Sequence, residues 1–344
     1  MNSNLFIRIL VLLVMIVSAT EVYSQRVSKA GTTSATFLEI GVGGKAQSMG
    51  GAFVGLSDDA SALYWNAGGI ARSETNQAIL YYADWLADTR FNFAGVIIPA
   101  GDAGTFGLSF TSLSMPDMSV RTVDMPEGTG EYFSAGDFAI GVTYARNITT
   151  RFSIGFTAKY IQQTIWHMSS RGVAIDAGTM FTTDLLNGLV IGASISNFGT
   201  GMKMEGRDTR SFYRVDVTKL GSNERIPFNI ELDTWDLPMI LQIGVAVPVY
   251  NEDDFKVVAA LDAMHPNDNY ESLNAGLEVS YHDWVFVRSG YQSLFLADSE
   301  GGLSLGVGVN SKMLFSENPV TFDYSYRDFG RLNSIQSFSV SVGF

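Results

Sequence analysis

Apolar and polar residues alternate with period two over most of the chain, from about residue 77 to the C-terminus. In residues 303–310, leucine or valine occupies every second position, and serine, glycine or asparagine occupies the others. Strict alternation predicts strands with one apolar face. The pattern and its interruptions predict fourteen strands, at residues 77–86, 90–98, 104–115, 136–147, 151–163, 172–183, 188–198, 239–249, 254–264, 271–281, 283–291, 302–314, 319–327 and 335–344.

The connections between these strands fall into two length classes. Those after the even-numbered strands are short, and those after the odd-numbered strands are mostly longer, except for the first hairpin at 87–89. Short turns on one side and long loops on the other are typical of outer-membrane barrels, whose even strand count places both termini in the periplasm. The short connections are 148–150, 184–187, 250–253, 282 and 315–318, and the longer ones are 116–135, 164–171, 199–238, 265–270, 292–301 and 328–334.

The residues opposite the apolar row indicate which face of the strands meets water. They are mostly glycine, serine, alanine and threonine, and small or charged side chains suit a polar lumen. Aromatic residues gather near the strand ends, where interfacial girdles lie. We therefore predict an all-β fold, a 14-stranded antiparallel transmembrane β-barrel; a secreted soluble all-β protein is the alternative. The charged residues of the inward row are Lys159, Asp176, Asp262, Glu278, Asp323 and Arg327.

The first 24 residues have the pattern of a secretory signal peptide. Arg8 precedes an unbroken apolar run of nine residues, 9–17. Nine apolar residues are too few for a membrane-spanning helix, which needs about 20. Small residues then offer two cleavage sites, one after Ala19 and a favoured one after Ser24. We expect export to the bacterial outer membrane, and three parts: a signal peptide (1–24), an N-terminal segment (25–76) and the barrel (77–344).

Charge and cysteine content exclude several classes of protein. The chain of 344 residues has 22 Lys and Arg against 35 Asp and Glu, a formal net charge of −13. Nucleic-acid binding needs a basic face, so we expect no nucleic-acid partner. The chain has no cysteine, so we expect neither a disulfide framework nor a lipid-modified cysteine.

Residues 25–76 do not alternate, and three interpretations compete for them. Gly41, Gly43 and Ala46 match the dinucleotide-binding pattern G-x-G-x-x-A, but that site needs a strand-helix-strand unit, and the following segments have the pattern of antiparallel strands. A glycine-rich linker does not explain the apolar residues of the stretch. We favour a small N-terminal hatch or plug, because a barrel of fourteen strands has a lumen too wide for its own side chains to fill.

One stretch of this segment, GGAFVGLSDDASALYWN at 50–66, resembles the N-terminal signature of the PorV/PorQ family of outer-membrane proteins. The resemblance covers nearly the whole mature chain, and it implies a FadL-like barrel whose N-terminal segment forms a hatch. The family usually reads W-N-P-A-G, whereas this chain has no proline after Trp65-Asn66, which loosens the turn there. The hatch residues that the resemblance implies are Gly50, Gly51, Asp58, Asp59, Trp65 and Asn66.

The final strand ends on an aromatic residue, Phe344. This strand must pair with the first one, because an open sheet edge in hydrocarbon leaves backbone groups without hydrogen bonds. A terminal strand with an apolar face and a final phenylalanine resembles the C-terminal signal that barrel-assembly machinery reads. We therefore expect that machinery and the lipids of the outer membrane as partners.

The resemblance implies a function in type IX protein secretion, which we favour from the sequence. PorV-like members bind the C-terminal domain of exported cargo and carry it between secretion components for surface attachment. The 199–238 loop is then a candidate contact surface, since exposed apolar groups among charges mark interaction sites. Packing of this loop as an ordinary lid is the alternative. Its apolar residues are Met202, Met204, Phe212 and Tyr213.

The second function is that of a FadL-like outer-membrane channel, which passes hydrophobic small molecules sideways into the membrane. That function needs an apolar path through the lumen. Catalysis is not expected, because the three histidines are far apart in sequence and no metal-ligand or nucleophile motif is present. We therefore expect no enzyme activity, cofactor or metal.

Overall fold

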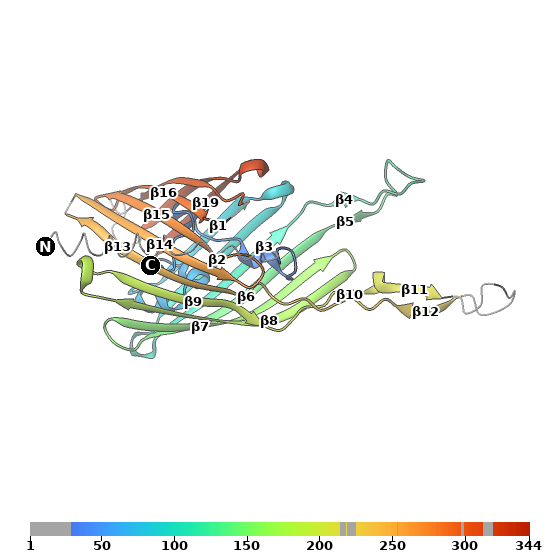
Figure 1. The fold of residues 1–344 in the computed structure, drawn as a ribbon, viewed down its shortest axis with the longest axis horizontal. Helices are drawn as coiled ribbons and strands as arrows, with labels where there is room; N and C mark the ends of the chain where they lie inside the picture. The colour runs from blue at the N-terminus through green and yellow to red at the C-terminus, as the bar shows by residue number, and fades with distance from the viewer. Residues whose placement is uncertain (1–28, 214–217, 219–224, 253, 297–298, 312–318) are drawn as a thin grey trace.

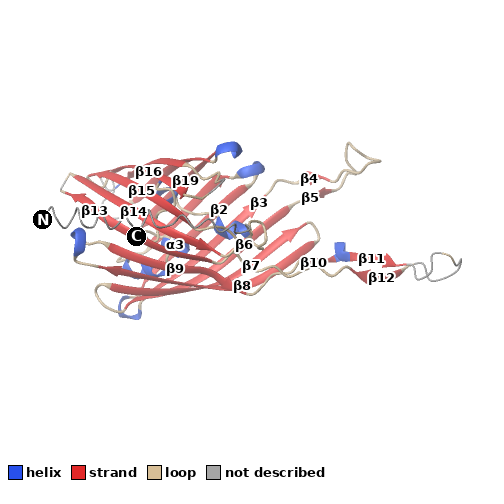
Figure 2. Ribbon diagram, in the orientation of Figure 1, coloured by secondary structure: helices blue, strands red, loops and turns tan. Residues whose placement is uncertain are grey.

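The structure is a computed structural model that describes residues 29–213, 218, 225–252, 254–296, 299–311 and 319–344, so the expected signal peptide lies outside the described residues. Within them, fourteen antiparallel strands form the wall of one closed barrel, as predicted (Figures 1 and 2). The wall strands are β1 (Gln77–Asp84), β2 (Arg90–Pro99), β3 (Thr105–Ser114), β6 (Ala135–Asn147), β7 (Phe152–Ile165), β8 (Met168–Thr182), β9 (Val190–Gly199), β13 (Ile240–Asn251), β14 (Phe255–Pro266), β15 (Ser272–Tyr281), β16 (Val285–Leu294), β17 (Leu303–Asn310), β18 (Val320–Asp328) and β19 (Ser334–Gly343).

The last strand closes the barrel against the first. β19 pairs with β1 from Gln77 opposite Gly343 to Ala83 opposite Ser337. The backbone N–H of Phe344 donates to the carbonyl oxygen of Asn76 at 3.0 Å, so the ladder continues to the end of the chain. Every wall strand therefore has a neighbour on both sides, which is the condition for a sheet in hydrocarbon.

The apolar row of each strand faces outward. Leu108 and Val307 are 52% and 50% exposed on the outer surface, whereas the inward-facing Asp262 and Asp323 are buried. An outer surface of leucine, valine and phenylalanine around a polar interior is that of a membrane barrel rather than a soluble one. No helix among the described residues is long and apolar enough to cross a membrane.

The connections sort to the two ends of the barrel, which we name the turn end and the loop end. The turn end carries both Asn76 and Phe344, and the loop end carries the two long connections (Figure 1). One predicted loop, 164–171, is wrong: β7 and β8 continue through it and meet in a tight turn at Trp166, whose φ is 52°. The paired residues in this region are mostly polar. The alternation of apolar and polar residues therefore ends before the pairing of the two strands ends.

Two hairpins project from the loop end well beyond the barrel wall (Figure 1). The first contains β4 (Met118–Ser119) and β5 (Tyr132–Phe133), and the second contains β11 (Arg210–Tyr213) and β12 (Ile226–Asn229). The short strand β10 (Glu205–Gly206) adds to the edge of β8. The short helices of the connections are η3 (Leu86–Asp88), η4 (Gly101–Ala103), η5 (Leu185–Asn187), η6 (Arg207–Thr209) and η8 (Gly330–Leu332).

The N-terminal segment lies inside the barrel, and we call residues 35–72 the hatch. It contains η1 (Thr36–Glu39), α2 (Gly44–Ser48), α3 (Ala62–Trp65) and η2 (Ala67–Arg72). α2 packs against β17 and η2 packs against β7, and these two strands stand on opposite sides of the ring. The hatch therefore spans the lumen from wall to wall.

Glycines in the wall let the hatch backbone approach closely. A Cβ added to Gly290 of β16 would lie 2.1 Å from the carbonyl carbon of Met49, so no larger residue fits there without movement. Gly50 has φ +66°, a conformation that favours glycine, and a Cβ there would lie 2.7 Å from the backbone nitrogen of Tyr291. Backbone thus packs on backbone where the hatch meets the wall.

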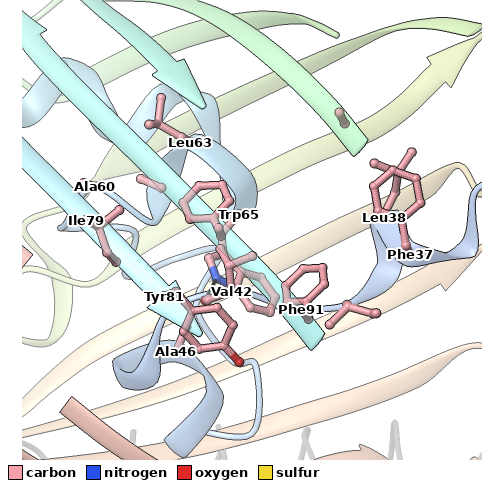
Figure 3. Close-up of a cluster of buried hydrophobic side chains, with 14 of the residues drawn as sticks. Phe37, Leu38, Val42, Ala46, Ala60, Leu63, Trp65, Ile79, Tyr81 and Phe91 are labelled. Carbon is pink, nitrogen blue, oxygen red and sulfur yellow. Dashed lines mark hydrogen bonds between the residues drawn. The ribbon is translucent and has the colours of Figure 1, made fainter. Parts of the chain in front are cut away.

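The hatch and the first two strands share one apolar core (Figure 3). The side chains of Trp65 in α3 and of Val42 lie beside those of Tyr81 in β1 and Phe91 in β2, and all four are buried. The indole N–H of Trp65 donates to the carbonyl oxygen of Val42 at 2.9 Å, which satisfies the one polar atom of this ring. This core fixes the hatch against one side of the lumen.

The outward orientation of Val307, in the middle of β17, can be tested by a charge. Val307→Arg places a guanidinium near the bilayer midplane, which costs ~2–4 kcal/mol at such positions. We expect the unfolding free energy in lipid vesicles to fall by about that amount, measured by denaturant titration. Leu332→Arg in η8, equally exposed but outside the wall, is the matched control and should change it by less than ~0.5 kcal/mol.

Candidate ligand cavity and hatch

A cavity of about 470 Å³ opens at the loop end of the lumen, above the hatch; we call it the mouth cavity. It is formed by η1 of the hatch, by inward-facing residues of the wall and by the loop-end connections. Cavities of about 300–1,000 Å³ with a mostly apolar lining are the usual binding sites for small molecules. Its apolar lining includes Phe37, Ile40, Trp85, Leu113, Leu296 and Phe329.

One cation, Arg327, lines the floor of the mouth cavity. Its guanidinium lies 4.4 Å from the ring centre of Phe329 and 5.4 Å from that of Trp85, so two aromatic rings hold it by cation–π contact. Its Nη1 donates to the Oε1 of Gln292 at 3.0 Å. Among the described residues no carboxylate lies within ion-pair distance of it. The floor is therefore polar and cationic, and it adjoins the aromatic part of the lining.

One carboxyl group, that of Glu39, also faces the mouth cavity. Desolvation, together with the nearby charge of Asp268, raises the pKa of Glu39 from 4.5 to about 7, although this residue is exposed to the solvent of the cavity. A carboxyl group with such a pKa is largely neutral in mildly acidic solution and ionised above neutrality. The polarity of the cavity therefore changes with pH.

The lumen below the mouth cavity is nearly filled. An inner cavity of about 30 Å³ shares Glu39, Gln292 and Arg327 with the mouth cavity, and this volume suits a single water molecule or two. The hatch residues Trp65 and Gln47 border it from below. The space available to a ligand therefore narrows sharply from the mouth cavity toward the hatch.

The expected hatch residues lie together in the lumen, where Asn66 connects the hatch to the wall. Its Nδ2 donates to the carbonyl oxygens of Val54 and of Thr179 in β8, both at 3.0 Å. Its Oδ1 accepts from the N–H of Gly68 at 3.1 Å and so caps η2. This cap orders the turn that lacks the proline of the related pattern.

Asp58 and Asp59 have different partners. Asp58 accepts from Nζ of Lys45 with both oxygens at 2.8 Å, an ion pair within the hatch. Asp59 accepts from the N–H of Ser61 at 2.7 Å, at the start of α3. Desolvation and the neighbouring charge of Asp58 raise the pKa of Asp59 from 3.8 to about 6. Neither residue touches the mouth cavity.

The four apolar residues of the 199–238 loop divide into two pairs. Met202 is buried, under a backbone bridge to Trp235, so its side chain is not available to a partner at the surface. Met204 is half-buried, and both methionines line a second cavity of about 460 Å³ beside the loop. Phe212 and Tyr213 on β11 are 53% and 56% exposed, so among the four predicted residues this pair presents apolar surface to solvent.

No group of three or more His, Cys, Asp or Glu residues that could hold a metal ion occurs among the described residues. The three histidines lie in separate places, each beside a different carboxylate: His167 by Asp208, His265 by Glu271 and His282 by Asp254. The absence of enzyme activity stays a prediction.

Sequence reasoning missed the mouth cavity and the part of Glu39 in it. The alternation predicts that Arg327 is an inward charge, but it does not show that two aromatic rings hold the guanidinium. The signal that the sequence offers is an arginine of the inward row two positions before Phe329, together with Trp85 at the end of the first hairpin strand. Their contact needs the closed ring, which a local pattern does not contain.

No sequence-family model matches the chain, and no curated protein matches it. Solved structures with similar folds include the toluene transporter TbuX of Ralstonia pickettii, at 11% identity and a TM-score of 0.54 over 88% of this chain and 97% of that one. The toluene transporter TodX of Pseudomonas putida matches at 13% identity and a TM-score of 0.51 over 88% and 97%. A Pseudomonas aeruginosa FadL homologue matches at 11% and 0.50 over 86% and 96%.

At these identities the similarity shows the fold alone. The fold is that of the FadL-like barrels, with fourteen strands and nearly equal coverage of both chains. A closed barrel with an apolar outer face and a polar lumen is built for the outer membrane. The chain therefore has the fold of the FadL-like outer-membrane barrels.

Proposed function

We propose that this protein is an outer-membrane channel that takes up small apolar molecules through the mouth cavity. The observation that supports this function most directly is a cavity of about 470 Å³ at the loop end of the barrel, whose lining includes aromatic and aliphatic side chains beside polar ones. The structural neighbours are described as a toluene transporter or a monoaromatic hydrocarbon channel, which suits a cavity lined by aromatic and aliphatic side chains. This function replaces type IX secretion as our first choice.

Filling the mouth cavity tests this function. Leu113→Trp adds bulk at the apolar wall of the cavity, where Leu113 is half-buried. We expect toluene binding by the full chain in lipid nanodiscs to weaken at least about tenfold, measured by competition with a fluorescent naphthalene probe. Leu332→Trp, at the same end of the barrel but outside the cavity lining, is the matched control. Equal binding by the wild type and Leu113→Trp contradicts a ligand site here.

Glu39 predicts how binding depends on pH. Its raised pKa means that the folded state binds the proton of Glu39 more tightly than the unfolded state does. Protonation of Glu39 therefore stabilises the folded state, fully below pH 4.5, and this contribution is lost as pH rises through about 7. An apolar ligand that covers the carboxyl group favours its neutral form further, so binding takes up protons. We expect toluene affinity to fall severalfold, by ~3–10-fold, between pH 5.5 and 8.5.

Glu39→Gln removes the titrating group and should leave affinity independent of pH over that range. Glu131→Gln on the exposed first hairpin is the control, and it should keep the wild-type profile. A pH profile that survives in Glu39→Gln shows that another group is responsible.

We keep cargo binding in type IX secretion, the PorV/PorQ function, as a second candidate. The observation in its favour is the projecting β11–β12 ribbon, which exposes Phe212 and Tyr213 far from the lipid surface (Figure 1). Exposed aromatic residues outside the membrane suit a protein partner such as the C-terminal domain of exported cargo. Under either function we propose that the termini are periplasmic, that barrel-assembly machinery reads Phe344 and that the chain performs no catalysis.

The ribbon variant Phe212→Ala/Tyr213→Ala separates the two candidates. If the ribbon binds cargo, exported proteins that share a C-terminal domain co-purify with the wild type from native membranes, and their recovery falls at least about tenfold in the variant. Mass spectrometry identifies them. The Leu113→Trp variant should keep this recovery. Co-purification of no exported protein with the wild type removes this candidate.

A further inference from the structure

A closed circuit of charged and polar side chains joins the hatch to the wall, and we call it the latch. It begins at Lys45 of α2, whose Nζ lies 2.8 Å from Asp58 in the hatch and 3.9 Å from Oε2 of Glu278 in β15. Arg288 of β16 donates from Nε to the same oxygen of Glu278 at 2.5 Å and from Nη1 to Oδ1 of Asp323 in β18 at 2.7 Å.

The circuit returns to the hatch by a second route. The hydroxyl of Ser339 in β19 donates to Oδ2 of Asp323 at 3.3 Å, and the N–H of Gly44, next to Lys45, donates to that hydroxyl at 3.0 Å. Two adjacent hatch residues are thus bound to one connected set of wall side chains. The set crosses β15, β16, β18 and β19, and α2 packs against the last three of these strands and against β17.

The members of the latch are withdrawn from water to different degrees. Arg288 is 2% exposed, and Glu278 and Asp323 are each 7% exposed, whereas the side chain of Asp58 is 48% exposed. Burial alone lowers the pKa of Lys45, but the charges of Asp58 and Glu278 outweigh it and raise the pKa, so this lysine stays cationic. Removing one partner of such a buried set leaves the others uncompensated.

The position of the latch gives it a role in passage. Glu278 lies three residues before the end of β15, and Arg288 lies three residues after the start of β16, so both belong to the turn-end half of the lumen. The mouth cavity is at the other end. A molecule moving from the mouth cavity through the lumen meets the hatch first and reaches the latch on its far side.

From this geometry we infer that Arg288 is the positioning residue of an ionic latch that holds the hatch closed, and that release of this latch opens the lumen toward the turn end. Arg288 contacts the carboxylates of both Glu278 and Asp323, and Glu278 also faces Lys45. The guanidinium of Arg288 therefore fixes the position of the carboxylate to which the hatch cation binds. This inference rests on the proposed channel function only for the direction in which a molecule passes. That the latch holds the hatch in the lumen does not depend on what the channel transports.

The other anchors of the hatch do not have this character. Asp262 of β14 accepts from the N–H groups of Phe53 and Val54 at 2.7 and 2.8 Å, a contact between wall and hatch backbone without a hatch charge. The apolar core around Trp65 is likewise permanent packing. Among the described residues, the ion pair between hatch and wall is that of Lys45 with Glu278. The latch can therefore open while the hatch stays tethered by the remaining contacts.

The test is the leak of a small hydrophilic solute through the full chain in proteoliposomes. We expect Arg288→Met to raise the liposome swelling rate in arabinose at least about tenfold over the wild type, because the wall carboxylates lose the cation that places Lys45. Arg288→Lys keeps the charge and should restore a part of the closure. Lys45→Met breaks the latch from the hatch side, leaves the wall intact and should leak as well, which covers the case in which Arg288→Met fails to assemble.

The matched control is Lys159→Met. Lys159 forms a lumenal ion pair with Asp176 at 2.8 Å, with side-chain exposures of 13% and 9%, but this pair joins β7 to β8 and no hatch residue. If the buried ion pairs only stabilise the fold, Arg288→Met, Lys45→Met and Lys159→Met should lose similar thermal stability, and none of them should leak. The inference predicts a leak in the two latch variants alone, at unchanged strand content by circular dichroism.

Two results overturn the inference: swelling at the wild-type rate in assembled Arg288→Met and Lys45→Met, or the same leak in Lys159→Met. Failure of the proposed function has a different outcome. If the wild type binds no toluene but the latch variants leak, the channel function fails and the latch stands; if toluene binds and the variants stay closed, the latch fails and passage takes another route.

Discussion

The pairing of β19 with β1 is the interaction on which the rest of the structure depends. In hydrocarbon an unpaired strand edge leaves its N–H and C=O groups without partners, so the sheet has to close. Closure with fourteen strands fixes a lumen that wall side chains do not fill. The hatch, the mouth cavity and the buried ion pairs are all consequences of that width.

The lumen is also where polar chemistry is concentrated. Outward positions are apolar because they meet lipid, so charges placed on wall strands point inward, where several are buried. Buried charges need partners. The hatch supplies some of them, as Lys45 does for Glu278, and aromatic rings take that place for Arg327. The interior therefore has fixed charges on both sides of the hatch and a cavity of mixed polarity above it.

The wall could be predicted from the sequence because its signal is local. The alternation in β17 or β19 can be seen within that strand alone, without knowledge of its neighbours. Closure of the barrel follows from the need to pair every strand edge and not from any particular residue. The 164–171 region shows the limit: when facing residues on both faces are polar, pairing continues without an apolar pattern. The one position where the related family has proline was also misleading, since the Asn66 cap orders that turn by other means.

The candidate site could not be predicted in the same way. The mouth cavity brings together Phe37, Trp85 and Phe329, which are far apart in sequence and meet only in the closed ring. Loop residues carry no period, so the burial of Met202 and the exposure of Phe212 could not be told apart from composition. What the alternation did supply was the set of inward charges, and both the cavity floor and the latch are made from members of that set.

The order of segments along the chain has a consequence for biogenesis. The hatch precedes β1, and the strand that seals the ring is the last one, so the hatch has been synthesised and exported before the ring can close. Because it touches opposite sides of the lumen, it offers wall strands on both sides a surface to pack against before the ring is sealed. The sequence of the hatch therefore has to suit two distant parts of the wall at once.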